Sequence, residues 1–300
     1  MRDDGHHGMA YRIASRRGTL CGVAGPTGSR TSIPLHANDL PGSTGDLIVT
    51  RQAGICMVTI QRPGKHNALS RSVLRALRGA FEDLADDTTL KGVVVRGAGE
   101  SYFAAGGDIA DLADVTSEAD TVAMVNECRA ALDAVRDCPV PVVAVLNGDA
   151  IGGGAELAVA CDFRIAGEHA HVGFIHGRLA ITPAWGGGAD LIDLVGASRA
   201  LRMMVRAELV PAATALHWGL VDVVAPGPGL EAALAGFLEP LLQPPAAVLR
   251  SCKAQAIAAR RGLSRDQRRA IEHDGIVTTW VGDDHQQAVA RFLAKEERWT

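Results

Sequence analysis

Hydrophobic residues recur with two different periods between residues 46 and 195. Short apolar runs rich in valine and isoleucine predict β-strands at 47–49, 55–60, 92–95, 142–146 and 162–166. Between these runs, apolar residues recur every three or four positions, which is the spacing of a helix that buries one face. Because strands and helices alternate along the chain, the pattern predicts βα units with a largely parallel sheet, an α/β fold.

Two of the helices have clear sequence signals. Ser70 is a good N-cap residue for the first of them. The apolar face of this helix consists of Val73, Leu74, Leu77 and Phe81. The apolar face of the second helix consists of Val122, Val125, Cys128, Leu132 and Val135. Pro139 and Pro141 end the second helix, because proline lacks the N–H that a helix interior needs.

The pattern divides the chain into three parts. Residues 1–45 are rich in Arg, Gly, Ser, Thr and Pro without a sustained period, and we interpret them as a mobile N-terminal extension. Residues 46–195 form the predicted α/β core. Residues 196–300 have an almost wholly helical pattern with breaks at glycines and prolines, so this part is predicted to be helical.

The composition narrows the class of protein. The 300 residues include 30 Lys and Arg against 34 Asp and Glu, so the chain lacks the basic surface that nucleic-acid binding requires. The longest apolar run, 142–146, is too short to span a bilayer, and no membrane partner is expected. The six cysteines lie far apart without a CxxC pair, and no apolar signal stretch occurs in the first forty residues. Both features favour a cytoplasmic protein with reduced thiols and without a metal site.

Two glycine-rich segments carry the candidate chemistry. They comprise 103–108 and 147–156, and each lies where a predicted strand ends and a helix can begin. Glycine lets the backbone take a positive φ and lets a ligand come close, and a helix start offers unpaired N–H groups. Two such N–H groups that converge would form an oxyanion hole for a thioester carbonyl that becomes an enolate or a tetrahedral anion. Alternatively, the glycines serve only as tight turns.

In this order and with these neighbours, the two segments resemble the crotonase (enoyl-CoA hydratase/isomerase) superfamily. The matching segments are Arg62-Pro63 through Asn67-Ala68-Leu69, Phe103 through Asp108, Asn147-Gly148 through Cys161-Asp162, Pro183 through Gly187, and Gly219-Leu220-Val221. The resemblance implies a crotonase-type spiral of ββα turns with the acyl-CoA site in the core and a C-terminal helical part used for assembly. It also implies an acyl-CoA thioester as substrate, no cofactor beyond the coenzyme A of that substrate, and a homotrimer or homohexamer.

The resemblance also assigns site residues. The backbone N–H groups of Gly107 and Gly153 would hold the thioester oxygen. The residues expected to bind coenzyme A or the acyl group are Lys65, His66, Ala105, Gly106, Asp108, Ile109, Trp185, Phe292 and Lys295. Simpler interpretations exist for some of them: Asp108 caps a helix, Trp185 is only a packing residue, and the terminal helix is a solvated end.

The reaction depends on two positions. In a hydratase of this family, two glutamates flank the substrate and hold a water; the first falls at Glu156, but His176 occupies the second. A histidine exchanges protons near neutral pH but does not reproduce a pair of carboxylates. The triple glycine before Glu156, the histidine and the turn at 183–187 resemble the branch that decarboxylates methylmalonyl- or ethylmalonyl-CoA.

We therefore expect an enzyme that stabilises a thioester enolate after loss of carbon dioxide, with His176 as a carboxylate contact or proton source. An enoyl-CoA hydratase or isomerase is the alternative within the same family. A non-catalytic acyl-CoA-binding scaffold, and a hydrolase or carbon–carbon lyase acting on a diketide thioester, also stay open. Arg178 is either a contact for a substrate carboxylate or coenzyme A phosphate, or an ordinary surface arginine.

Overall fold

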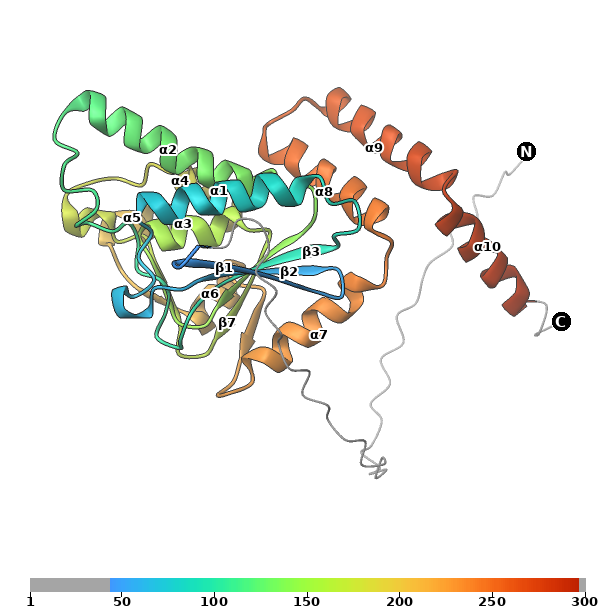
Figure 1. Cartoon of the computed structure of the whole chain (residues 1–300), viewed down its shortest axis with the longest axis horizontal. Helices are drawn as coiled ribbons and strands as arrows, with labels where there is room; N and C mark the ends of the chain where they lie inside the picture. The colour runs from blue at the N-terminus through green and yellow to red at the C-terminus, as the bar shows by residue number, and fades with distance from the viewer. Residues whose placement is uncertain (1–43, 297–300) are drawn as a thin grey trace, which may run out of the picture. The chain divides into compact units, whose positions relative to one another are not determined.

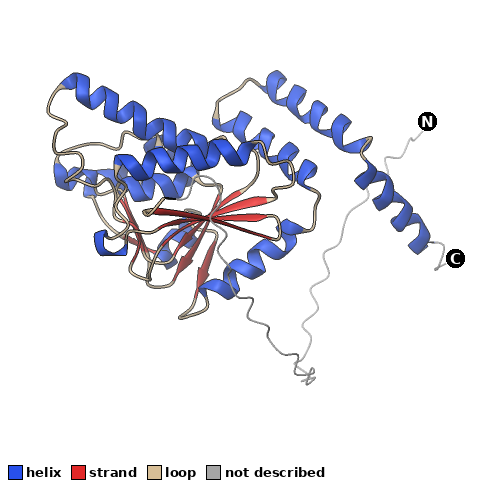
Figure 2. Cartoon of the chain, in the orientation of Figure 1, coloured by secondary structure: helices blue, strands red, loops and turns tan. Residues whose placement is uncertain are grey.

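The computed structural model describes residues 44–296, with side chains through residue 294. The predicted N-terminal extension, residues 1–45, therefore lies outside the described residues except for its last two. In the described part, strands and helices alternate as the sequence pattern predicts (Figures 1 and 2).

The larger of two sheets has six strands in the order β1-β2-β3-β5-β7-β10. They are β1 (Leu47–Gln52), β2 (Ile55–Ile60), β3 (Gly92–Gly97), β5 (Val142–Leu146), β7 (Phe163–Gly167) and β10 (Val223–Ala225). β1 and β2 form an antiparallel hairpin around Ala53 and Gly54, and all other neighbours are parallel. β3 and β5 are buried along almost their whole length, as expected for parallel strands covered on both faces.

Helices cover this sheet on both sides. Those on one face are α1 (Arg71–Ala85), α2 (Glu118–Arg136) and α3 (Gly153–Ala160). The opposite face is covered by α7 (Leu230–Leu242). The division follows the alternation of side chains along a strand: Val93 and Val95 belong to the core under the first three helices, and Val94 to the core under α7.

The two helices with clear sequence signals are confirmed as α1 and α2. The Ser70 hydroxyl accepts a hydrogen bond from the Val73 N–H, as predicted for an N-cap. In α2, Cys128, Leu132 and Val135 are buried, whereas Val122 lies on the solvent-exposed side of the helix.

The smaller sheet explains how the chain winds. Its strands are β4 (Tyr102–Ala104), β6 (Asp149–Ile151), β8 (His171–Gly173) and β9 (Val210–Pro211). β4, β6 and β8 directly follow β3, β5 and β7 of the larger sheet, and β4 and β6 lead into α2 and α3. Each turn of the chain thus consists of a long strand, a short strand and then helix, which brings the ends of the short strands together.

The remaining helices follow the core. They are α4 (Gly187–Val195), α5 (Ala197–Arg206), α6 (Ala212–Trp218), α8 (Ala246–Arg260), α9 (Arg265–Trp280) and α10 (Asp283–Glu296). The segment predicted to be helical also contains β9 and β10, and β10 supplies the edge strand of the larger sheet. These strands have only two and three residues, which is too short for a two-residue period to show in the sequence.

A buried ion pair connects helix α8 to the core. Lys253 is 4% exposed and forms an ion pair with Asp162, the residue before β7.

Across the described residues, no single helix has the length and apolar character to cross a membrane. Only α7 and α8 meet those two criteria as a pair, and they are bent by 101° to each other.

Candidate functional site

The two glycine-rich segments meet in space. Gly106 has a φ of 102° and Gly152 a φ of 54°, both in the region that favours glycine. A Cβ atom at Gly106 would lie 3.2 Å from the carbonyl oxygen of Ile151 and 3.4 Å from the nitrogen of Gly153. The turn after β4 and the turn after β6 are therefore in direct backbone contact, which a side chain at Gly106 would disturb.

The N–H groups of Gly107 and Gly153 lie next to this contact. Gly153 is the first residue of α3, so its N–H has no acceptor within the helix. Within residues 44–296, neither N–H donates a hydrogen bond. Both glycines also face one indole ring: a Cβ at Gly107 would lie 3.5 Å from the ring of Trp185, and one at Gly153 would overlap it.

A cavity of about 690 Å³ opens at these glycines. Ala105, Gly106, Gly107, Gly153 and Trp185 line it, as do Glu156 and His176. The remaining lining is mostly apolar and includes Leu112, Met124, Val125, Ile151, Leu179 and Ile181. This volume lies in the usual range for small-ligand sites, and the few polar groups are gathered at one place in it.

Glu156, on the first turn of α3, has no free oxygen. Its side chain is buried, with 1% of the residue exposed. Oε2 accepts hydrogen bonds from the backbone N–H groups of Trp185, at 2.9 Å, and Gly187, at 3.0 Å. Oε1 lies 3.1 Å from Nε2 of His176. The carboxylate thus ties α3 to the turn before α4 and to His176.

His176 begins a short 3₁₀ helix, His176–Leu179, and is 9% exposed. Because a carboxylate oxygen only accepts hydrogen bonds, Nε2 carries a proton and donates to Glu156. Nδ1 is buried and has no partner among the described residues. It is the one buried side-chain nitrogen or oxygen without a hydrogen bond among the described residues that line the cavity. A buried polar atom without a partner in the chain is uncommon, so Nδ1 has hydrogen-bonding capacity that the described residues do not use.

Of three further residues predicted to contact the substrate, two line the cavity and one does not. Asp108 does not line the cavity and instead pairs with Arg62 at 2.9 Å, which holds the pKa of Asp108 below its usual value. Ile109 lines the cavity and is 61% exposed. Arg178 also lines it, but two of its guanidinium nitrogens donate to the carbonyl of Ala207.

Lys65 and His66 lie outside this cavity. Their carbonyls already accept hydrogen bonds, from the N–H groups of Ala68 and Ala105 respectively. The His66 ring stacks on Tyr102 with 4.4 Å between ring centroids. The hydrogen bond from Ala105 places His66 beside the first glycine-rich segment, and the contact of Lys65 and His66 with coenzyme A stays a prediction.

Among the described residues, none of the terminal helix α10 lines the cavity. Phe292 lies on α10 and is 62% exposed. Lys295 lies in the last turn of the same helix, but its side chain is outside the described residues. Within residues 44–296, no three His, Cys, Asp or Glu side chains gather where they would hold a metal ion.

Sequence reasoning missed the residues that brace the site. Arg136, at the end of α2, donates a hydrogen bond of 3.1 Å to the carbonyl of Trp185. Leu112 has its Cδ1 atom 3.1 Å from a Cβ placed at Gly107. Neither residue belongs to a motif, and only the three-dimensional contacts identify them.

Known proteins resemble the chain in sequence and fold. The model of the enoyl-CoA hydratase/isomerase family matches residues 50–300. An ethylmalonyl-CoA decarboxylase of Xenopus laevis is 31% identical over 240 residues, which cover 79% of this chain and 80% of that protein. The ethylmalonyl-CoA decarboxylase of Bos taurus is 30% identical over 254 residues, covering 84% and 82%. A solved enoyl-CoA hydratase from Bacillus anthracis has a TM-score of 0.78 at 28% identity and covers 83% of this chain and 96% of its own. The predicted crotonase-type fold is confirmed.

Proposed function

Because the chain belongs to the enoyl-CoA hydratase/isomerase family, we propose that it decarboxylates a methylmalonyl- or ethylmalonyl-CoA-type thioester. The observation that carries this proposal is the hydrogen bonding around Glu156. Both of its oxygens are occupied within the chain, and the free buried nitrogen of the cavity belongs to His176. The relatives named ethylmalonyl-CoA decarboxylase support the same reaction.

Glu156 is poorly placed to activate a water. If its carboxylate turned toward a water, it would release the N–H groups of Trp185 and Gly187, which are buried. Leaving a buried N–H unpaired costs about 1–3 kcal/mol. Decarboxylation does not require that rearrangement, because it uses no water-activating pair. In this proposal, Glu156 is a positioning residue for His176 and for the turn at Trp185.

The first step breaks a carbon–carbon bond. When the substrate carboxylate stands out of the plane of the thioester, the electron pair of its bond to Cα passes into the thioester carbonyl as carbon dioxide leaves. The product is an enolate with negative charge on the former carbonyl oxygen. The unpaired N–H groups of Gly107 and Gly153 would donate to this oxygen, and such donors act strongest on charge that develops in the transition state.

The second step moves a proton to Cα. A protonated His176 would deliver it from Nδ1, the ring nitrogen without a partner. Glu156 at 3.1 Å from Nε2 stabilises the charged ring and fixes its orientation. Solvent water returns the proton to the ring, so the net reaction exchanges carbon dioxide for one proton. The apolar walls of the cavity keep other water away from the enolate.

A product screen by mass spectrometry tests the proposal. The purified chain is incubated separately with methylmalonyl-, ethylmalonyl- and crotonyl-CoA, and products are scored for loss of carbon dioxide, gain of water or release of free coenzyme A. Loss of carbon dioxide from a malonyl substrate is the expected result. Efficient hydration of crotonyl-CoA without decarboxylation contradicts the proposal and favours the hydratase, to which the Bacillus anthracis structure is similar.

The screen also tests two of the remaining alternatives, a hydrolase and a non-catalytic scaffold. Release of free coenzyme A identifies a hydrolase. A non-catalytic scaffold would bind acyl-CoA without changing any of the three thioesters. Either result contradicts decarboxylation.

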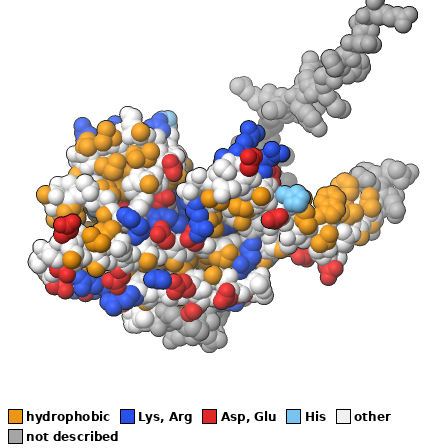
Figure 3. Space-filling view, turned by 90° about the horizontal axis from the view of Figure 1, so that it is seen from above, with side chains coloured by type: hydrophobic (Ala, Val, Ile, Leu, Met, Phe, Trp, Pro, Cys, Tyr) orange, Lys and Arg blue, Asp and Glu red, His pale blue; other side chains and the backbone are white. Residues whose placement is uncertain are grey.

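We also propose that α9 and α10 mediate assembly into a homotrimer or homohexamer. α9 has no buried residue, although it packs along α8. Apolar side chains gather on the outer helices (Figure 3), and Trp280, Phe292 and Leu293 are each more than half exposed. An exposed apolar patch of this kind is typical of an interface between protein chains.

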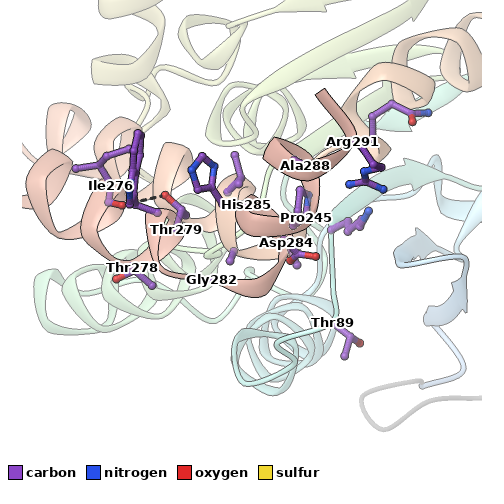
Figure 4. Close-up of a pocket in the computed structure, with 16 residues that line it drawn as sticks. Thr89, Pro245, Ile276, Thr278, Thr279, Gly282, Asp284, His285, Ala288 and Arg291 are labelled. Carbon is purple, nitrogen blue, oxygen red and sulfur yellow. Dashed lines mark hydrogen bonds between the residues drawn. The ribbon is translucent and has the colours of Figure 1, made fainter. Parts of the chain in front are cut away.

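A second cavity lies beside these helices (Figure 4). It has a volume of about 790 Å³ and is lined by Ile276, Trp280, His285 and Arg291 together with Lys91 and residues 245–248. The rings of Trp280 and His285, which both line it, lie 4.6 Å apart. Its mixture of apolar and charged groups is suited to a segment of a second copy, and the mass of the protein in solution tests this proposal.

A further inference from the structure

Arg136 contacts the turn at Trp185 but does not line the cavity at Gly107 and Gly153. Its guanidinium group makes three hydrogen bonds: Nη2 to the carbonyl of Trp185 at 3.1 Å, Nε to Asp190 at 2.8 Å, and Nη1 to Asp133 at 2.9 Å. The side chain is only 12% exposed. All three nitrogens of the guanidinium are therefore committed, so its position is fixed by α2, α4 and the turn between the core and α4.

Asp190 completes this arrangement from the first turn of α4. Its side chain is 11% exposed, and burial raises the pKa of its carboxyl above the usual value although Arg136 acts in the opposite direction. A buried ion pair contributes little net stability, because desolvation offsets the attraction. The pair does, however, fix α2 and α4 relative to each other and to the carbonyl of Trp185.

Trp185 transmits that geometry to the cavity. Its N–H is held by Glu156 and its C=O by Arg136, so the backbone of this residue is fixed from both sides. Its indole fills the space that a Cβ at Gly153 would take, and it lies 3.5 Å from a Cβ placed at Gly107. A shift of the Trp185 backbone would therefore move a ring that lies against the two residues with unpaired N–H groups.

We propose that Arg136 and Asp190 are positioning residues for the reaction, acting through Trp185 on the N–H groups of Gly107 and Gly153. This inference rests on the proposed function, because it requires these N–H groups to bind the thioester oxygen. Neither residue lines the substrate cavity. Their loss should therefore weaken binding of the enolate-like transition state without removing a contact to the substrate.

The test compares Arg136→Met, Arg136→Lys and Asp190→Asn with Arg261→Met as the control. Arg261 forms a 2.8 Å pair with Asp137 in the same neighbourhood, but it is 58% exposed and touches neither Trp185 nor the cavity. Steady-state kinetics are measured on the substrate that the wild type turns over. Affinity is measured for two analogues: a nitro-CoA compound, whose nitronate imitates the enolate, and a thioether that lacks the carbonyl oxygen.

A displacement of about 1 Å in a catalytic group costs about 100-fold in rate, so kcat should fall about 10- to 100-fold in Arg136→Met. The Michaelis constant and the thioether affinity should stay within about threefold, while the nitronate affinity falls by nearly the factor lost in kcat. Arg136→Lys and Asp190→Asn should show the same split with a smaller loss. Arg261→Met should behave as the wild type.

Equal losses for both analogues, or an unchanged kcat in a folded Arg136→Met, overturn the inference. If Arg136→Met does not fold, the inference is tested with Asp190→Asn and with the partial recovery of Arg136→Ala by added guanidinium. If neither variant loses kcat and nitronate affinity while keeping its thioether affinity, the inference is overturned. A wild type that prefers the thioether to the nitronate and turns over no malonyl substrate contradicts the proposed function and this inference together.

Discussion

The substrate cavity and the C-terminal helices differ in how far a single chain satisfies their side chains. At the cavity, the carboxylate of Glu156 is buried and receives three hydrogen bonds, all from the same chain. On α9, α10 and the turn between them, large apolar side chains are left open to solvent. They are Ile276, Val277, Trp280, Val281, Val289, Phe292 and Leu293. The carboxylate in the cavity is thus satisfied within one chain, whereas α9 and α10 leave large apolar side chains exposed.

This contrast orders the expected effects of mutation. Changes at the cavity should alter the chemical step and leave assembly intact. Changes on α9 and α10 should alter assembly or substrate affinity and leave the chemical step intact. A variant that violates this separation would show that the cavity depends on a neighbouring subunit.

The largest effect is expected for His176→Gln. Glutamine keeps a hydrogen bond to Glu156 but cannot deliver a proton, and general acid–base groups typically contribute about 10²–10⁴-fold. We therefore expect kcat to fall by about 100-fold or more, measured as release of carbon dioxide.

His171→Gln is the matched control, because Nδ1 of His171 also pairs with a carboxylate, Asp149, at 2.9 Å, but lies outside the cavity. Its activity should equal that of the wild type. If His176→Gln retains full turnover, the proton comes from elsewhere and the assigned role of His176 is wrong.

The next largest effect is expected for Gly153→Pro. Proline is tolerated at the first position of a helix, where the N–H has no helical partner, but it removes one proposed donor to the thioester oxygen. The loss in kcat should be about 100-fold, as for removal of an oxyanion-hole donor. Because the new ring also meets Trp185, the thioether analogue should be used to verify that the cavity still binds ligand. Retained turnover in a folded variant would rule out Gly153 as a donor.

Much of the core was predictable because its signals are local. The strands at 55–60 and 142–146, the Ser70 cap and the two glycine segments each follow from a few adjacent residues. β4, β6 and β10 escaped prediction because three residues cannot display a period. Glycine clusters predict that two backbone segments come close together. Which two segments meet is determined by the way the chain winds into a spiral.

The hydrogen bonding of the site was less predictable. Glu156 was identified through the family motif, but its partners Trp185 and Gly187 lie 29 and 31 positions further along the chain. Nothing in the local sequence around Arg136 points to the carbonyl of Trp185, 49 positions away. The hydrogen bonds from Ala68 and Ala105 to the carbonyls of Lys65 and His66 likewise form only in the folded turn, so the sequence does not reveal them.

A smaller effect on chemistry is expected at the outer helices. Deleting residues 284–300 removes most of α10, and we expect a lower mass in solution or a raised Michaelis constant, with kcat little changed. Phe292→Ser is the finer variant: a central apolar interface residue is worth about 2 kcal/mol, so subunit dissociation should increase more than tenfold.

Val205→Ser serves as the control for Phe292→Ser, because Val205 is 70% exposed on α5, away from these helices. Mass measurement by light scattering at several protein concentrations gives the comparison. An unchanged mass and unchanged kinetics in the truncated protein would contradict a role of α10 in assembly and in covering the substrate.

The smallest effect is expected from thiol modification, and it separates the same two regions. Burial raises the pKa of Cys56, Cys128 and Cys161 to about 12 and that of Cys138 to about 11, so these core thiols stay protonated and unreactive at neutral pH. Cys252 on α8 is exposed. Brief treatment with iodoacetamide, followed by peptide mass mapping, should label Cys252 and none of the four buried thiols. Because Cys252 lines neither the substrate cavity nor the turn at Trp185, kcat should not change. Rapid labelling of Cys128 or Cys161 in the native protein would mean that the helices over the glycine segments open readily, and the cavity would then not be the rigid region of the molecule.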